Sequence, residues 1–165
     1  EYVTSRDYPD TMKYLREGRN IIILRTFSKI HGLAGLRIGY GITKKKFVNE
    51  MNKVRQPFNT NSLAQIGALA ALSDYRHVEE SRRINEEGKM YLYKELNSMG
   101  VKYLPTEANF IYIDIEGNAF QLYERFLKEG VIVRPMGHRN LRLTIGLPDE
   151  NRRFIKVFRK TLNLS

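Results

Sequence analysis

Two short apolar runs separated by a glycine-containing loop place the first constraint on the fold. Residues 20–26 are rich in β-branched side chains and follow Gly18, and residues 36–42 form a second run that contains two glycines. Apolar runs of this length are typical of buried β-strands, whereas helices need longer segments. The sequence therefore predicts two strands joined by a loop over residues 27–35, and this loop carries Lys29.

Two helices are predicted after these strands. Residues 44–54 repeat apolar side chains at helical spacing, and Pro57 ends that element. Ser62 and Gln65 have the spacing of a capping box at the start of an alanine- and leucine-rich helix that reaches about Leu72. This second helix is apolar on nearly all sides, so we expect it to be buried.

The second half of the chain has the pattern of a small α+β unit. We expect a long charged helix over residues 77–99, ended by Gly100, with a domain boundary near its start at about residues 75–80. Alternating strands and amphipathic helices follow it. They are predicted at residues 109–115 (strand), 119–129 (helix), 131–134 (strand, stopped by Pro135), 141–145 (strand) and from Pro148 onwards (helix).

The charge and composition argue against several classes of protein. The net charge is +10, but the only tight basic run, Lys44–Lys46, is interpreted as the solvated start of a helix, and no nucleic-acid-binding motif is present. No apolar run approaches the roughly 20 residues that span a bilayer. Cysteine is absent, and His77 and His138 have no partner at ligand spacing. We therefore expect a cytoplasmic protein that binds no nucleic acid, membrane or metal.

The loop around Lys29 contains the groups of an anion-binding site. The hydroxyls of Thr26 and Ser28 flank the lysine, and Arg37 follows eight residues after it. A guanidinium presents a planar fork to phosphate, and hydroxyls add further donors. A lysine beside such a cradle can bond covalently to an aldehyde whose phosphate is bound there. Taken alone, a lysine is far more often a surface residue, so the prediction depends on the whole pattern.

Residues 28–37 follow the pattern Ser-Lys-x-x-Gly-Leu-Ala-Gly-Leu-Arg. This pattern resembles the lysine segment of the class I/II aminotransferases, which have the pyridoxal-phosphate-dependent fold type I. Within that group the chain most resembles the histidinol-phosphate aminotransferases. The resemblance covers nearly the whole chain, and its landmarks in the second half are Asn109–Phe110 and residues 133–135 and 141–146. It implies an α/β fold, in which residues 1–76 form the C-terminal part of the cofactor-binding large domain and residues 77–165 form the small C-terminal domain.

The resemblance also assigns roles to individual residues. Lys29 would be the catalytic lysine that holds pyridoxal 5'-phosphate as a Schiff base, and Thr26, Ser28 and Arg37 would bind the cofactor phosphate. Arg142 would bind the carboxylate of the substrate or of 2-oxoglutarate, and Arg134 would contact a substrate acid or phosphate. The strand pattern supports Arg142 independently, because Leu141, Leu143 and Ile145 share one face and Arg142 points to the other.

The implied activity is transamination of L-histidinol phosphate with 2-oxoglutarate in histidine biosynthesis, by a homodimer. An aromatic aminotransferase and a threonine-phosphate decarboxylase of the same group remain alternatives, as does a non-enzymatic, anion-binding fragment. Among neighbouring residues, His31 would act at most through others, Asn109 would fix backbone near the domain junction, and Tyr40 would belong to the core.

The family's Asp that pairs with the pyridine nitrogen and its Tyr on the ring hydroxyl match no residue of this chain. Both belong to a motif that would lie before Glu1. We therefore expect the chain to be roughly the C-terminal half of the enzyme. Since protonation of the pyridine nitrogen makes the ring an electron sink, this half alone should have little or no transaminase activity.

Overall fold

The computed structural model of the chain describes residues 1–162. The chain forms two compact units, the first made of Glu1 and Ser5–Glu80 and the second of Tyr2–Thr4 and Ser81–Ser165. The boundary between Glu80 and Ser81 lies within the long helix α4 (Tyr75–Ser98). The last three residues of the expected 77–165 domain lie outside the described part.

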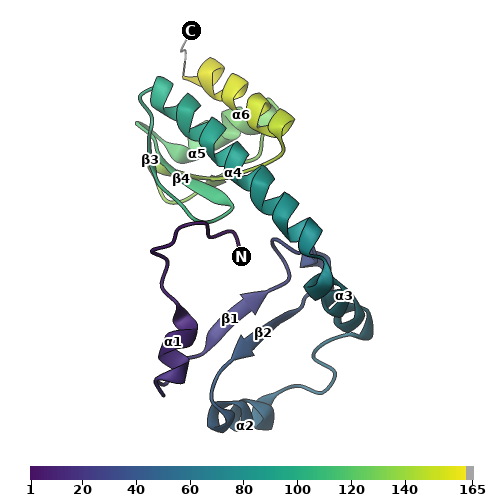
Figure 1. The fold of residues 1–165 in the computed structure, drawn as a ribbon. Coiled ribbons are helices and arrows are strands. Elements are labelled where there is room, and N and C mark those ends of the chain that lie inside the picture. Colours follow the sequence, from purple (N-terminus) through teal and green to yellow (C-terminus); the bar gives the residue numbers. More distant parts are fainter. Residues whose placement is uncertain (163–165) are drawn as a thin grey trace. The chain divides into compact units, whose positions relative to one another are not determined.

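The first unit contains the predicted strand pair (Figure 1). Its strands β1 and β2 are antiparallel, with Thr26 opposite Gly39. A side chain at Gly39 would place its Cβ 2.7 Å from the carbonyl oxygen of Arg25, so the close approach of the strands requires glycine there. The elements of the unit are α1 (Thr11–Arg16), β1 (Ile23–Thr26), the 3-10 helix η1 (Ala34–Leu36), β2 (Gly39–Ile42), α2 (Lys45–Val54), α3 (Ser62–Ser73) and the start of α4.

Two predictions for helix α3 are wrong, the position of its N-cap and its burial. Its N-cap is Asn61, whose side chain accepts a hydrogen bond from the backbone N–H of Ala64 at 2.8 Å, so the predicted capping box at Ser62 is wrong by one residue. Only Ala64 and Ala68 are buried, because the larger apolar side chains face away from the rest of the described chain. The exposed ones are Leu63, Ile66, Leu69 and Leu72.

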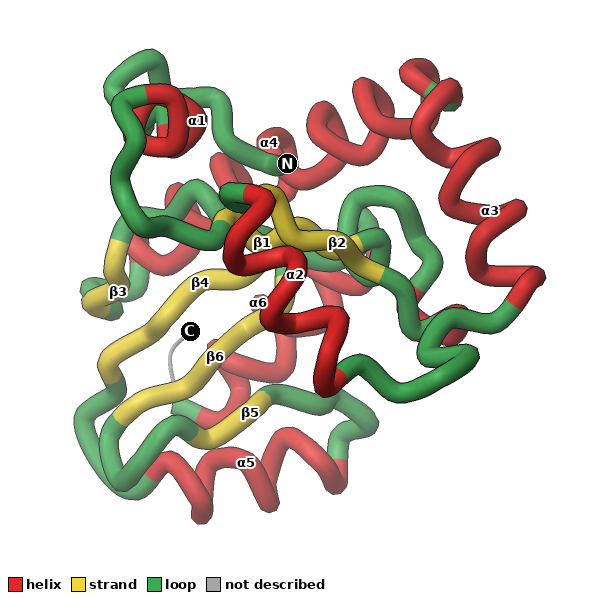
Figure 2. The backbone as a smooth tube through the Cα atoms, turned by 90° about the horizontal axis from the view of Figure 1, so that it is seen from below, coloured by secondary structure: helices red, strands yellow, loops and turns green. Residues whose placement is uncertain are grey.

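The second unit is an antiparallel sheet packed against helices. Its four strands have the order β3-β4-β6-β5, and Figure 2 shows β4, β6 and β5 side by side. The sequence did not indicate β3, which is only three residues long. Besides most of α4, the elements are β3 (Lys102–Leu104), β4 (Phe110–Asp114), α5 (Ala119–Lys128), β5 (Arg134–Pro135), β6 (Asn140–Thr144) and α6 (Pro148–Thr161).

The strand expected over residues 131–134 is largely absent. Val131 and Val133 are buried, but only Arg134 and Pro135 pair with β6. Because β5 is an edge strand, no second strand needs the N–H that proline lacks, and the strand includes Pro135 rather than stopping before it.

One hydrophobic core holds the second unit together. The alternation predicted for β4 and β6 is confirmed, because Ile111, Ile113, Leu141 and Leu143 are all buried on the face that meets the helices. Three phenylalanines, Phe126 of α5 and Phe154 and Phe158 of α6, pack with ring centroids 5.2–5.7 Å apart. The opposite face of the sheet carries the arginines of β5 and β6.

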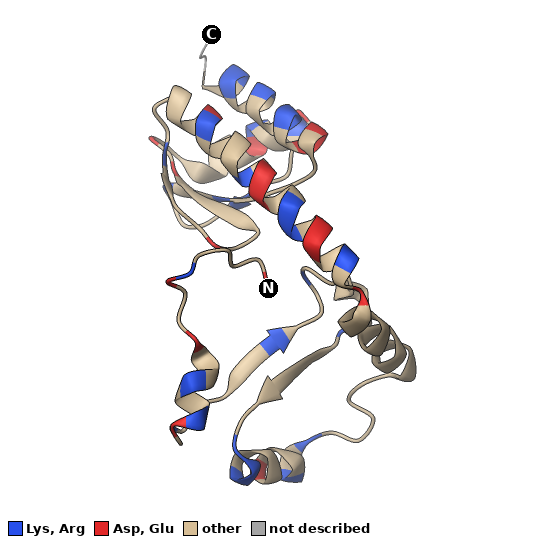
Figure 3. Cartoon of the chain, viewed as in Figure 1, with Lys and Arg blue, Asp and Glu red and all other residues tan. Residues whose placement is uncertain are grey.

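Helix α4 is charged along its exposed surface, where basic and acidic residues alternate (Figure 3). Its buried side contacts the loop before β4. The Lys89 amine donates to the backbone oxygen of Thr106 at 3.4 Å, and the Tyr93 hydroxyl accepts the backbone N–H of the same Thr106 at 2.8 Å. Within residues 1–162, no helix is long and apolar enough to cross a membrane.

Candidate active site

The loop that follows β1 presents Lys29 to solvent between two buried anchors. Phe27 is 4% exposed and Ile30 is 1% exposed, whereas Lys29 is exposed. Within residues 1–162 the Lys29 side chain makes no hydrogen bond or ion pair. The two anchors fix the backbone on both sides of the lysine, so its amine is available to react.

Backbone hydrogen bonds close the loop into a compact turn. The N–H of Leu33 donates to the carbonyl oxygen of Phe27 at 2.9 Å, and the N–H of Gly32 donates to that of Lys29 at 2.8 Å. Gly32 has a φ of +69°, a left-handed conformation that glycine adopts without strain. The lysine backbone is therefore part of a hydrogen-bonded structure rather than of an open loop.

Thr26 and Ser28 lie next to one another at the end of β1. The Thr26 hydroxyl oxygen accepts the backbone N–H of Ser28 at 3.0 Å, which fixes the position of both residues. A hydroxyl that accepts through its oxygen still has its own proton to donate. Both side chains are partly buried and retain the capacity to donate to a bound anion.

Arg37 lies at the same end of the strand pair. It is two residues from Gly39, the partner of Thr26, and adopts a left-handed conformation with φ of +56°. One guanidinium nitrogen donates to the carbonyl oxygen of Ala34 at 2.7 Å. An arginine has five N–H donors, so most of its donors remain for an anion. The donor set of this loop thus fits a phosphate next to a reactive amine.

The second unit gathers its two candidate arginines on the sheet face away from the helices. Arg134 on β5 lies directly opposite Arg142 on β6, which in turn lies opposite Tyr112 on β4. The Arg142 guanidinium stacks over the ring of Phe110 at 4.5 Å from its centroid. A stacked arginine beside a second cation is suited to bind a carboxylate or phosphate.

The structure shows the surroundings of three further residues for which the sequence suggested minor roles. Tyr40 is 45% exposed in this chain, so the expectation that it belongs to the core is wrong. The His31 ring packs 5.0 Å from that of Phe27, and its Nδ1 is buried without a hydrogen-bond partner in the described part of the chain. The backbone oxygen of Asn109 accepts the N–H of Ile145 at 3.0 Å.

The sequence assigned no role to His77 and indicated only that it has no partner at metal-ligand spacing. Its Nε2 lies 2.9 Å from the carbonyl oxygen of Ile30, although the two residues are 47 positions apart. No local pattern encodes a contact of this kind, so only the tertiary structure could reveal it.

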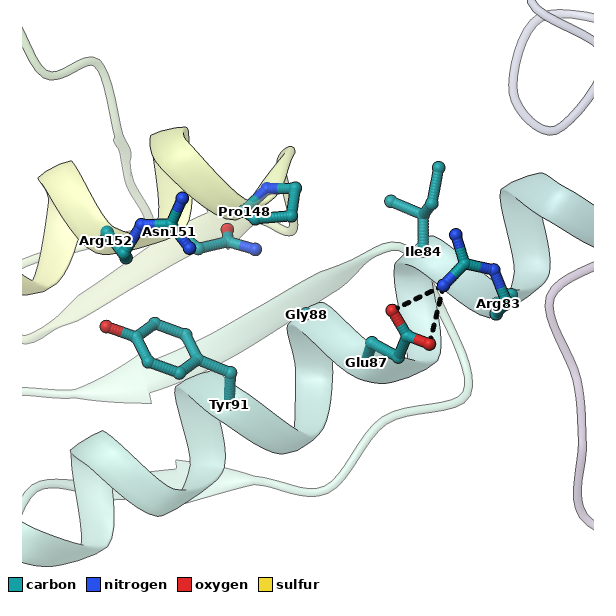
Figure 4. A pocket seen from close by; sticks show the side chains of 8 residues that line it. All are labelled: Arg83, Ile84, Glu87, Gly88, Tyr91, Pro148, Asn151 and Arg152. Carbon is teal, nitrogen blue, oxygen red and sulfur yellow. Dashed lines mark hydrogen bonds and ion pairs between the residues drawn. The ribbon is translucent and has the colours of Figure 1, made fainter.

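A hollow of about 460 Å³ also lies between α4 and α6 (Figure 4). Its arginines already have acidic partners: Arg83 pairs with Glu87 at 2.7 Å, and Arg152 pairs with Asp149. Its lining residues include no lysine or histidine. This hollow therefore lacks the nucleophile and the free cations of the lysine loop, and we do not assign the active site to it.

A family model for class I and II aminotransferases matches residues 2–158. The chain belongs to the class I and II aminotransferase family. The histidinol-phosphate aminotransferase of Moorella thermoacetica is 50% identical over 98% of this chain, which covers 43% of that relative. The chain therefore spans less than half the length of this family member.

Solved structures of the family share the fold. The histidinol-phosphate aminotransferase of Clostridium acetobutylicum matches with a TM-score of 0.85 at 25% identity, over 93% of this chain and 49% of that one. The Sinorhizobium meliloti enzyme, solved in complex with pyridoxal-5'-phosphate, matches with a TM-score of 0.79 at 24% identity, over 86% of this chain and 41% of that one. The fold is that of the fold type I pyridoxal-phosphate-dependent aminotransferases, as the sequence predicted.

Proposed function

We propose that the full-length protein carrying this chain transfers the amino group of L-histidinol phosphate to 2-oxoglutarate, using pyridoxal 5'-phosphate. The observation that carries the proposal is the exposed Lys29 amine, fixed between buried Phe27 and Ile30 beside the hydroxyl and guanidinium donors of its loop. The expected homodimer, cytoplasmic location and place in histidine biosynthesis belong to the same proposal.

Each residue of the loop has a distinct task. Lys29 would hold the cofactor by its aldehyde carbon through Nζ and, as a free amine, would move a proton at that atom. Thr26, Ser28 and Arg37 hold the cofactor phosphate through hydrogen bonds from neutral and charged donors. When bound, the cofactor supplies an electron sink for the carbanion that develops on the substrate.

The sheet of the second unit supplies the substrate-binding groups. Arg142 binds a carboxylate, held in orientation by its contact with the Phe110 ring. Arg134, opposite it on the edge strand, adds a second positive charge for a substrate acid or phosphate. A pair of cations suits 2-oxoglutarate and a phosphorylated amine, since each of these substrates is an anion.

The test of the lysine is covalent trapping. The full-length protein is incubated with pyridoxal 5'-phosphate and reduced with borohydride, and the modified peptide is identified by mass spectrometry. We expect modification at Lys29 and its complete loss in Lys29→Ala. Lys45 is an exposed lysine of α2 and serves as the control, so the Lys45→Ala variant should be modified at Lys29 to the same extent as the wild type. Trapping that survives in Lys29→Ala would favour the non-enzymatic interpretation.

The amino donor is tested separately. We expect the first half-reaction to be much faster with L-histidinol phosphate than with phenylalanine. Equal or reversed rates would indicate an aromatic aminotransferase, and release of carbon dioxide from threonine phosphate would indicate the decarboxylase. The 165-residue chain alone is expected to show little or no steady-state transamination.

A further inference from the structure

The side chain of His77 in helix α4 contacts the loop that carries Lys29. The imidazole Nε2 of His77, in the first turn of α4, lies 2.9 Å from the carbonyl oxygen of Ile30, the residue that follows Lys29. Because a carbonyl can only accept, Nε2 carries the proton and donates it. The loop after β1 reaches the start of α4 in Figure 1, where this bond is made.

The helix holds His77 in a defined position. Its backbone N–H donates to a side-chain oxygen of Asp74 at 3.0 Å, the arrangement of a helix cap. The N–H of Val78 donates to the carbonyl oxygen of the same Asp74 at 3.3 Å. The imidazole therefore projects from a capped helix start rather than from a flexible connection.

The contact complements the internal hydrogen bonds of the loop. Thr26 fixes the residue before Lys29 through the Ser28 N–H, and His77 fixes the residue after it through the Ile30 carbonyl. The imidazole also lies next to Gly32, because a Cβ on that residue would be 3.9 Å from the His77 Nε2. His77 thus supplies the only side-chain hydrogen bond to residues 30–33 that the described part of the chain shows.

We propose that His77 is a positioning residue for Lys29: its Nε2–H bond to Ile30 holds the loop so that the lysine amine is directed at the cofactor aldehyde. This inference rests on the proposed function of Lys29.

The first experiment measures the loop without cofactor, by hydrogen exchange of the Gly32 and Leu33 amides in the full-length protein. A net hydrogen bond of typical strength corresponds to about fivefold in local opening, so His77→Ala should exchange about fivefold faster at both amides. His77→Gln, which restores an N–H donor, should return exchange to within about twofold of wild type. His77→Phe keeps a ring without the donor and should behave as His77→Ala does, and Arg76→Ala is the matched control on the same turn.

The second experiment measures reactivity at saturating cofactor. We expect His77→Ala and His77→Phe to lower the rate of borohydride-trapped modification of Lys29, and kcat of the half-reaction, by about fivefold with KM unchanged, and His77→Gln to restore both. Unchanged exchange in His77→Ala, or wild-type behaviour of His77→Phe, would overturn the inference. If His77→Ala fails to fold, the Gln and Phe variants decide the question. Trapping that persists in Lys29→Ala would overturn the proposed function instead, while the cofactor-free exchange would still report on the His77 bond.

Discussion

Two arginines face each other on an open sheet surface, and their repulsion makes a measurable prediction. Arg134 and Arg142 occupy directly opposed positions of β5 and β6. Opposed like charges destabilise strand pairing, and cross-strand pairs contribute roughly 0.2–1 kcal/mol. Replacing Arg134 by Gln removes one charge and keeps a side chain of similar polarity. We expect the free energy of opening the β5–β6 pairing to increase by about 0.5 kcal/mol, which corresponds to about twofold slower local opening.

The amide of Met136 reports this opening directly. Met136 directly follows β5, and its backbone N–H donates to the carbonyl oxygen of Asn140 at 2.8 Å. Its hydrogen exchange at low ionic strength should be about twofold slower in Arg134→Gln than in wild type. The difference should disappear at 1 M salt, where the screening length is about 3 Å. Lys156→Gln, an exposed position on α6, makes the same change in net charge and should leave the Met136 amide unaffected.

Two results would refute this reasoning. Faster exchange in Arg134→Gln at low salt would mean that the arginine stabilises the strand pairing through its side chain. A difference that persists at 1 M salt would mean that charge repulsion is not its cause. A bound anion provides a further check, because 2-oxoglutarate should slow exchange at Met136 more in the wild type, which has both arginines, than in Arg134→Gln.

Three further predictions concern local structure. Asn61→Ala should lower the free energy of unfolding of the first unit by about 1 kcal/mol, whereas Ser62→Ala should change it by less than about 0.5 kcal/mol, as measured by chemical denaturation. Gly88→Ala should destabilise the second unit by about 1–3 kcal/mol, since its Cβ would lie 2.8 Å from two buried side-chain atoms, while Gly35→Ala meets nothing within 4 Å and should be tolerated. Burial raises the pKa of Tyr93, so the folded state retains the phenol proton more strongly than the unfolded state does; stability should therefore decrease as pH rises above about 10, and Tyr93→Phe should flatten that decrease in pH-dependent thermal denaturation.

The sequence by itself determined the features that depend on neighbouring residues. The alternation of Ile111 and Ile113 with Phe110 and Tyr112 predicted β4, and the Lys29 loop was recognised from a continuous motif. Helices α2, α5 and α6 were predicted from their apolar spacing, because a helix or strand repeats its buried positions at a fixed interval along the chain. These patterns are local, so no knowledge of packing was needed to read them.

Only the tertiary structure decided which distant residues meet. The pairing of Arg134 with Arg142 depends on the register of β5, a strand too short to have a pattern of its own. The contact of His77 with Ile30 joins residues 47 positions apart. Helix α3 is apolar on nearly all sides, and whether a residue such as Leu69 is buried or exposed depends on what packs against the helix. Such contacts arise from the packing of whole elements against one another, and one sequence records the composition of each element but not its neighbours.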